Sequence, residues 1–80
     1  MSQQLTVRSA AREDLFALHD LELQVRSRLA GRVRDFHLVY RQDGLVLQGQ
    51  TRTYYAKQLA QQAVMTATSL PIRANNIDVS

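Results

Sequence analysis

Apolar residues recur at helical spacing in the first third of the chain. When the sequence is plotted at 100° per residue, five of them fall within one arc of about 120°: Leu15, Leu18, Leu21, Val25 and Leu29. Ser9 or Asp14 can cap the start of this segment, because their side chains accept hydrogen bonds from first-turn amides. Gly31 favours termination at the other end. The pattern therefore predicts a helix over about residues 11–30.

The middle of the chain changes to strand periodicity. Residues 36–41 and 45–51 alternate between apolar and polar side chains, and Asp43-Gly44 lies between them, which is typical of a hairpin with a two-residue turn. Such a turn predicts a register that pairs Tyr40 with Leu47, Leu38 with Gly49, Phe36 with Thr51, Val39 with Gln48, His37 with Gln50, and Arg41 with Val46. The first three pairs form the more apolar face. Gly49 inside a strand suggests that a helix packs closely there.

A second helix and a third strand complete the pattern. Thr53 is a candidate N-cap for a helix that extends to about Thr68. Its predicted buried arc consists of Tyr55, Ala56, Leu59, Ala60, Ala63, Val64 and Ala67. Pro71 blocks further helix, and residues 72–79 alternate as a strand.

The predicted fold class is α+β, in the order α-β-β-α-β. A crossover through the second helix makes the third strand parallel to the second, which gives a three-stranded mixed sheet with two helices packed on one face. The pattern leaves open whether the third strand lies beside the second strand or the first. We expect residues 1–10 to form an N-terminal tail and residues 11–80 to form a single domain.

Composition narrows the function. Eighty residues provide one small core, without room for separate substrate and cofactor domains. The absence of cysteine excludes disulfides and thiolate zinc sites. No signal peptide and no membrane span is visible, so we expect a cytoplasmic protein, periplasmic only if it was cut from a longer chain.

No pattern of catalytic residues is present. The sequence lacks the nucleophile, zinc-protease, phosphate-loop and dinucleotide motifs. His19 and His37 fall on different elements with no third ligand in view. We therefore expect no catalytic residue, no metal, no cofactor and no enzymatic activity.

The densest charge is a run of arginines at the end of the first predicted helix. The chain carries a net charge of +3, and four arginines occur here without an acid between them: Arg26, Arg28, Arg32 and Arg34. Guanidinium groups suit phosphate oxygens, so these are the candidate contacts for an anionic ligand or lipid. The alternative is that they only complement the negative end of the helix dipole. Nucleic acid is an unlikely partner, because the sheet aromatics Phe36 and Tyr40 share the predicted core face.

Both helices also carry apolar residues outside the core arc. On the first helix Phe16, Leu23 and Ala30 recur every seven residues, and on the second Tyr54 and Met65 lie opposite the buried arc. A second apolar stripe is covered within the chain, for example by the N-terminal tail, or it meets a partner. The candidate partner surface, for a homodimer or else a membrane, is Phe16, Leu23, Tyr54 and Met65.

Residues 23–79 resemble the bacterial BON domain family. The resemblance rests on Asp43-Gly44, Leu45-x-Leu47-x-Gly49, the helical segment 55–60, and Asn75-x-Ile77-x-Val79. The resemblance implies an α-β-β-α-β fold, with Asp43, Gly44, Gly49 and Asn75 as its structural motif. It also implies contact with phospholipid or membrane surfaces. The sequence thus predicts a non-enzymatic binding module that contacts phospholipid, or alternatively a homodimeric assembly module.

Overall fold

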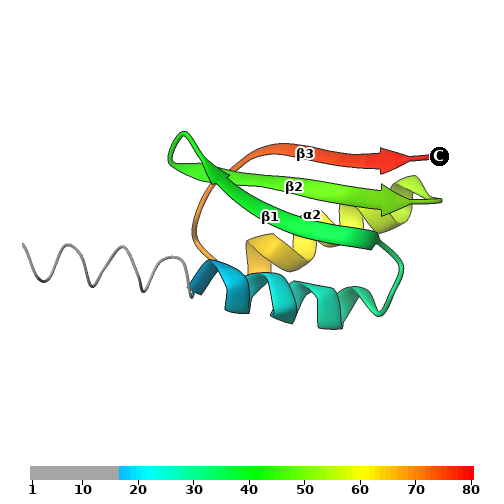
Figure 1. The fold of residues 1–80 in the computed structure, drawn as a ribbon, viewed down its shortest axis with the longest axis horizontal. Helices are drawn as coiled ribbons and strands as arrows, with labels where there is room; N and C mark the ends of the chain where they lie inside the picture. Colours follow the sequence, from blue (N-terminus) through cyan, green and yellow to red (C-terminus); the bar gives the residue numbers. More distant parts are fainter. Residues whose placement is uncertain (1–16) are drawn as a thin grey trace, which may run out of the picture.

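The structure, a computed structural model, describes residues 17–80, and two helices cover one face of a three-stranded sheet (Figure 1). Within this part the first helix spans residues 17–29. It is followed by β1 (Arg34–Arg41), β2 (Gly44–Thr51), α2 (Tyr54–Ala67) and β3 (Ile72–Val79). The order α-β-β-α-β and the mixed sheet confirm the predicted α+β fold. The predicted N-terminal tail (residues 1–10) and residues 11–16 of the predicted first helix lie outside the described residues.

The sheet order answers the question that the sequence left open. β2 is the central strand, antiparallel to β1 and parallel to β3. α2 crosses from the end of β2 to the start of β3 and lies over both strands. The sheet consequently has two edges, one formed by β1 and one by β3.

The core lies between the sheet and the two helices. The first helix contributes Leu21, Val25 and Leu29, which are buried as the helical arc predicts, whereas Leu18 is only partly buried. The largest fully buried side chain is that of Phe36 in β1. Burial of an aromatic side chain of this size stabilises a small domain by about 3 kcal/mol or more.

Tyr40 departs from the predicted core. It follows Phe36 and Leu38 on the same face of β1, but its side chain is half exposed beside the hairpin turn. The alternation places it on the correct face, and its position at the end of the strand leaves it uncovered.

The predicted hairpin register is wrong by two residues. The turn is formed by Gln42 and Asp43, with φ of 52° and 62°, and not by Asp43-Gly44. Arg41 pairs with Gly44, and the remaining pairs are Leu38 with Leu47, Val39 with Val46, Tyr40 with Leu45, and His37 with Gln48. Because a shift of two residues preserves the alternation, every side chain keeps its predicted face.

Gly44 explains the shifted turn. A Cβ atom at this position would lie 2.5 Å from Cγ of Arg73 and 2.9 Å from the carbonyl oxygen of Pro71. The next residue, Leu45, donates its backbone N–H to the same Pro71 oxygen at 2.8 Å. Gly44 is therefore the first residue of β2, where its missing side chain lets the start of β3 approach.

The start of the hairpin contains a break in the pairing register that the sequence pattern does not predict. The register shifts between Arg34 and His37, where Asp35 has φ of 54°. Opposite this bulge, a Cβ atom on Gly49 would lie 2.8 Å from Cγ1 of Val33. The close neighbour of Gly49 is thus the chain that enters β1, and the prediction of a helix at this position is wrong.

α2 confirms the predicted cap and corrects one buried residue. The Thr53 hydroxyl accepts the N–H of Ala56 at 3.1 Å, as an N-cap does, and the helix ends at Ala67 with Thr68 as its C-cap. Tyr55, predicted to be buried, is 67% exposed. It precedes buried Ala56 by one residue, and a rotation of 100° turns its side chain away from the sheet.

Candidate functional site

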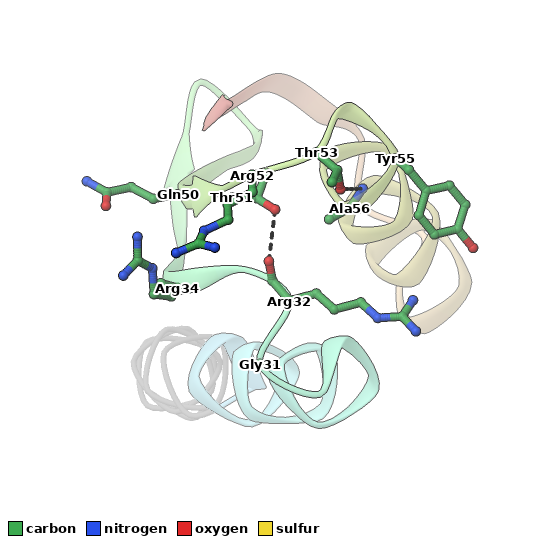
Figure 2. Close-up of a pocket in the computed structure, with 9 residues that line it drawn as sticks. All are labelled: Gly31, Arg32, Arg34, Gln50, Thr51, Arg52, Thr53, Tyr55 and Ala56. Carbon is green, nitrogen blue, oxygen red and sulfur yellow. Dashed lines mark hydrogen bonds between the residues drawn. The ribbon is translucent and has the colours of Figure 1, made fainter. Parts of the chain in front are cut away.

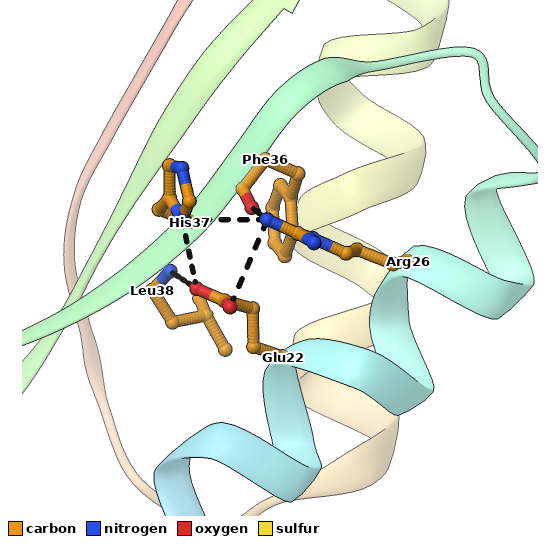
Figure 3. A network of polar contacts seen from close by, with 5 residues as sticks. All are labelled: Glu22, Arg26, Phe36, His37 and Leu38. Atoms are coloured by element: carbon orange, nitrogen blue, oxygen red, sulfur yellow. Dashed lines mark hydrogen bonds and ion pairs between the residues drawn. The ribbon is translucent and has the colours of Figure 1, made fainter.

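The structure separates the four arginines of the predicted cluster. Arg26 binds the backbone of β1: its Nε and one terminal nitrogen donate to the carbonyl oxygen of Phe36 at 2.9 and 2.7 Å (Figure 3). The same guanidinium lies 3.8 Å from the carboxylate of Glu22, one helical turn earlier. Arg26 therefore has a structural role, which the sequence pattern did not reveal.

Glu22 completes this contact. Its Oε1 accepts the backbone N–H of Leu38 at 2.8 Å and lies 3.3 Å from Nδ1 of His37. In a β-sheet, a neighbouring strand would donate a hydrogen bond to the Phe36 carbonyl oxygen and accept one from the Leu38 N–H, the groups on either side of His37. Glu22 and Arg26 imitate such a strand, and we call this pair the β1 edge cap.

The other arginines have different surroundings. Arg28 is exposed on the first helix. Arg32 and Arg34 line an open cleft of about 620 Å³ together with Arg52, a residue that the sequence reasoning missed (Figure 2). The full lining is Gly31, Arg32, Arg34, Gln50, Thr51, Arg52, Thr53, Tyr55 and Ala56.

Two segments far apart in the sequence build the cleft. Residues 31–34 enter β1, and residues 50–56 lead from β2 into α2. The buried Thr51 hydroxyl joins them by donating to the carbonyl oxygen of Arg32 at 2.8 Å. In Figure 2 the Arg34 and Arg52 side chains point to the same side of the cleft, and Arg32 extends toward the side of Tyr55.

The cleft is strongly positive. None of its lining residues is acidic, and the first turn of α2 contains no acid. Among residues 17–80, no ion pair joins Arg32, Arg34 or Arg52 to a carboxylate. The start of α2 also brings the positive end of its helix dipole, with first-turn N–H groups that a helix leaves without internal partners.

These groups define the chemistry of the cleft. Guanidinium groups form paired hydrogen bonds with phosphate or carboxylate oxygens, and side-chain amide and hydroxyl groups can add further donors. The lining holds no carboxylate and no imidazole that could transfer a proton. Within the described part of the chain, no group of three or more histidine and acidic side chains gathers at a common point where a metal could bind. The chemistry of the lining therefore suits an anion such as a phosphate or a carboxylate better than a cation.

The candidate partner residues that the structure describes lie on two helices. Leu23 is 46% exposed on the first helix, and Tyr54 and Met65 are exposed on α2. Phe16 lies outside the described residues. A homodimer through the first helix stays a prediction.

Asn75, from the structural motif, connects β3 with α2. Its Nδ2 donates to the carbonyl oxygen of Lys57 at 3.1 Å and to Oε1 of Gln61 at 3.3 Å. Its Oδ1 accepts the N–H of Ile77 at 3.3 Å. This side chain thus fixes the position of α2 along β3.

Arg52 carries a sequence signal in retrospect. It stands between Thr51, which is buried, and Thr53, which caps α2. A basic residue directly before an N-cap, with no acid in the following turn, brings positive charge to the positive end of a helix dipole. This arrangement is unfavourable without a counter-charge, and it is the sequence signal by which Arg52 could have been added to the candidate residues.

Comparison with known proteins adds no relative. No helix among residues 17–80 has both the length and the apolar character needed to cross a membrane. No family model, curated protein or solved structure matches the chain, so the BON resemblance stays a prediction based on the residues that carry it.

Proposed function

We propose that the protein is a non-enzymatic, BON-like module that binds the phosphate groups of anionic lipids through the arginine cleft. The observation that supports this proposal is the lining itself: Arg32, Arg34 and Arg52 all line one cleft, and none of the described residues that line it is acidic. Cations that share a cleft without a counter-charge among residues 17–80 repel each other, and a bound anion relieves that repulsion.

Tyr55 favours a lipid surface over a soluble anion. Tyr55 is one of the residues that line the cleft, and it is 67% exposed. Tyrosine is enriched at membrane interfaces, where the apolar ring and the hydroxyl meet different environments. A bilayer surface engages the ring and the arginines together, whereas free phosphate engages only the charges.

The test compares vesicle binding by two variants of equal charge. R34E/R52E alters the cleft, and R28E/R41E alters two exposed arginines that do not line it. Each variant changes the net charge from +3 by −4 to −1, so non-specific attraction falls equally. On vesicles containing phosphatidylglycerol we expect R34E/R52E to bind at least about tenfold more weakly than R28E/R41E, since each basic residue at the surface contributes about 1 kcal/mol.

Further arms identify the ligand. Vesicles of phosphatidylcholine alone should not bind, and binding to the anionic vesicles should weaken as salt rises from 0.05 to about 0.3 M. An NMR titration with inorganic phosphate should move the amide signals of residues 31–34 and 50–56 only at much higher concentration. Equal losses in the two variants, or no vesicle binding at low salt, would contradict the proposal. Cleft-dependent binding to short single-stranded RNA or DNA, without vesicle binding, would assign the site to nucleic acid instead.

A further inference from the structure

The two edges of the sheet are treated differently. β1 carries the Glu22–Arg26 edge cap, whereas none of the described residues forms a strand or helix paired to the outer side of β3. Ser80 donates its N–H to the carbonyl oxygen of Thr51 at 3.0 Å. Since backbone groups of successive residues in a strand point to opposite sides, this bond shows which residues of β3 direct their N–H and C=O groups toward β2. The backbone groups of Asn75, Ile77 and Val79 therefore point away from β2, toward solvent.

This β3 edge lacks most of the features that prevent strand pairing. β3 contains no proline and no lysine, and its charged residues are Arg73 and Asp78. Arg73 is held by a hydrogen bond from Nε to the carbonyl oxygen of Gln42 at 3.0 Å. Among residues 17–80, the one protection is the Asn75 side chain, which accepts the Ile77 N–H in a long bond of 3.3 Å. The outward-facing backbone groups along the eight residues of β3 can therefore pair with a further strand.

A stripe on α2 runs beside this edge. Lys57 and Gln61 contact Asn75, so this flank of the helix faces β3. Gln61 also belongs to a row of residues with spacings of four, three and four. We call this row the α2 stripe: Tyr54, Gln58, Gln61 and Met65. Tyr54 is 64% and Met65 56% exposed.

We propose that a second copy of this chain occupies the β3 edge and the α2 stripe, forming a two-fold symmetric dimer. The spacing of the stripe is symmetric about its centre between residues 59 and 60. Antiparallel α2 helices therefore place Tyr54 against Met65 of the second copy, and Gln58 against Gln61. Each apolar end of the stripe meets the other apolar end, and each amide meets an amide.

One axis satisfies both parts of this interface. Asn75 contacts Lys57 and Gln61, so it lies level with the middle of the stripe. A two-fold axis near Asn75 pairs β3 with β3 in antiparallel orientation and brings the stripes together at the same time. The product is a continuous six-stranded sheet with all helices on one face, because two three-stranded sheets join. No residue of β3 or of the stripe lines the arginine cleft, so the dimer leaves that site open.

The α2 stripe contains no acidic or basic residue that opposes association. A tyrosine ring against a methionine thioether is a favourable contact. The antiparallel ladder also gives partners to backbone groups at the β3 edge that have no strand partner among residues 17–80. In the dimer the Ile77 N–H exchanges its long bond to Asn75 for a ladder bond.

The test uses sedimentation equilibrium of the full chain and two variants that differ at one residue. Y54E/M65E places like charges opposite each other across the axis, whereas Y54E/M65K places opposite charges there. Because Tyr54 and Met65 are exposed, both variants keep the core intact. We expect a wild-type dimer at micromolar to millimolar concentration, at least about tenfold weaker dimerisation in Y54E/M65E, and recovery in Y54E/M65K.

Leu23→Glu is the matched control on the first helix, since it charges another exposed apolar residue. It should leave the dimerisation constant unchanged, and hydrogen exchange of the Asn75 amide should slow as the wild-type concentration rises. A wild-type monomer at 1 mM, a dimer lost only in Leu23→Glu, or a dimer that leaves this amide unprotected would each overturn the proposal.

Discussion

The two edges of this sheet show two ways in which a small domain can treat an exposed strand. At β1, Glu22 and Arg26 of the first helix bind the backbone on both sides of His37 with contacts of 2.7 to 2.9 Å. At β3, Asn75 covers one N–H group through a contact of 3.3 Å. Charged side chains thus bind two backbone groups of the first edge, whereas no strand or helix among residues 17–80 pairs with the second. The comparison teaches that an i, i+4 pair of charged side chains on a helix can supply the hydrogen bonds that a neighbouring strand would otherwise make.

Removal of Glu22 should have the largest effect. Glu22→Ala leaves the partly buried Leu38 N–H without its acceptor and Arg26 without its counter-charge. We expect a loss of about 2 kcal/mol in the free energy of unfolding, which lowers the melting temperature by roughly 10 °C. Urea denaturation and calorimetry measure both quantities. Asp20→Ala, an exposed acid on the same helix, is the control, and an equal effect of the two substitutions would mean that the edge cap contributes nothing.

The equivalent change at the other edge should be smaller. Asn75→Ala removes contacts with Lys57, Gln61 and the Ile77 N–H that are all 3.1 Å or longer. We expect about 1 kcal/mol of destabilisation in urea denaturation, measured at a protein concentration where the chain is monomeric. A loss as large as that of Glu22→Ala would show that the edges are equally guarded.

The smallest effects separate structural from binding arginines. Arg34→Gln and Arg52→Gln remove charges that have no ion-pair partner among the described residues, so each should change the free energy of unfolding by less than about 0.5 kcal/mol. Arg26→Gln should cost about 1 kcal/mol, because the paired bonds to Phe36 are lost. Thermal denaturation of the three variants measures this difference, and similar losses in all three would contradict the assignment of roles.

The fold was largely predictable because its elements have clean periodicity. The helical arc through Leu21, Val25 and Leu29 and the cap at Thr53 are local signals, and the structure confirms them. The turn at Gln42-Asp43 was not predictable in this way. The Asp-Gly pair is a strong turn signal, yet Gly44 is required within β2 by the approach of Pro71 and Arg73, which are remote in sequence.

The candidate site was predicted only in part, for a related reason. Proximity in sequence grouped Arg26 with Arg32 and Arg34, but the bulge near Asp35 and the edge of β1 separate them. Arg52, which directly follows β2, lines the same cleft although it is remote from these arginines in sequence. A run of charges indicates where cations are frequent, and tertiary structure determines which of them share a ligand.

The Thr51–Arg32 hydrogen bond has a thermodynamic consequence. It joins the two segments that form the cleft, so the cleft is absent from the unfolded chain. Any ligand of the cleft is therefore also a stabiliser of the fold, and at a free concentration of 100 times its Kd it adds about 2.7 kcal/mol to the free energy of unfolding. A thermal scan of the protein with different soluble anions can thus identify those that bind the cleft, because each of them raises the melting temperature.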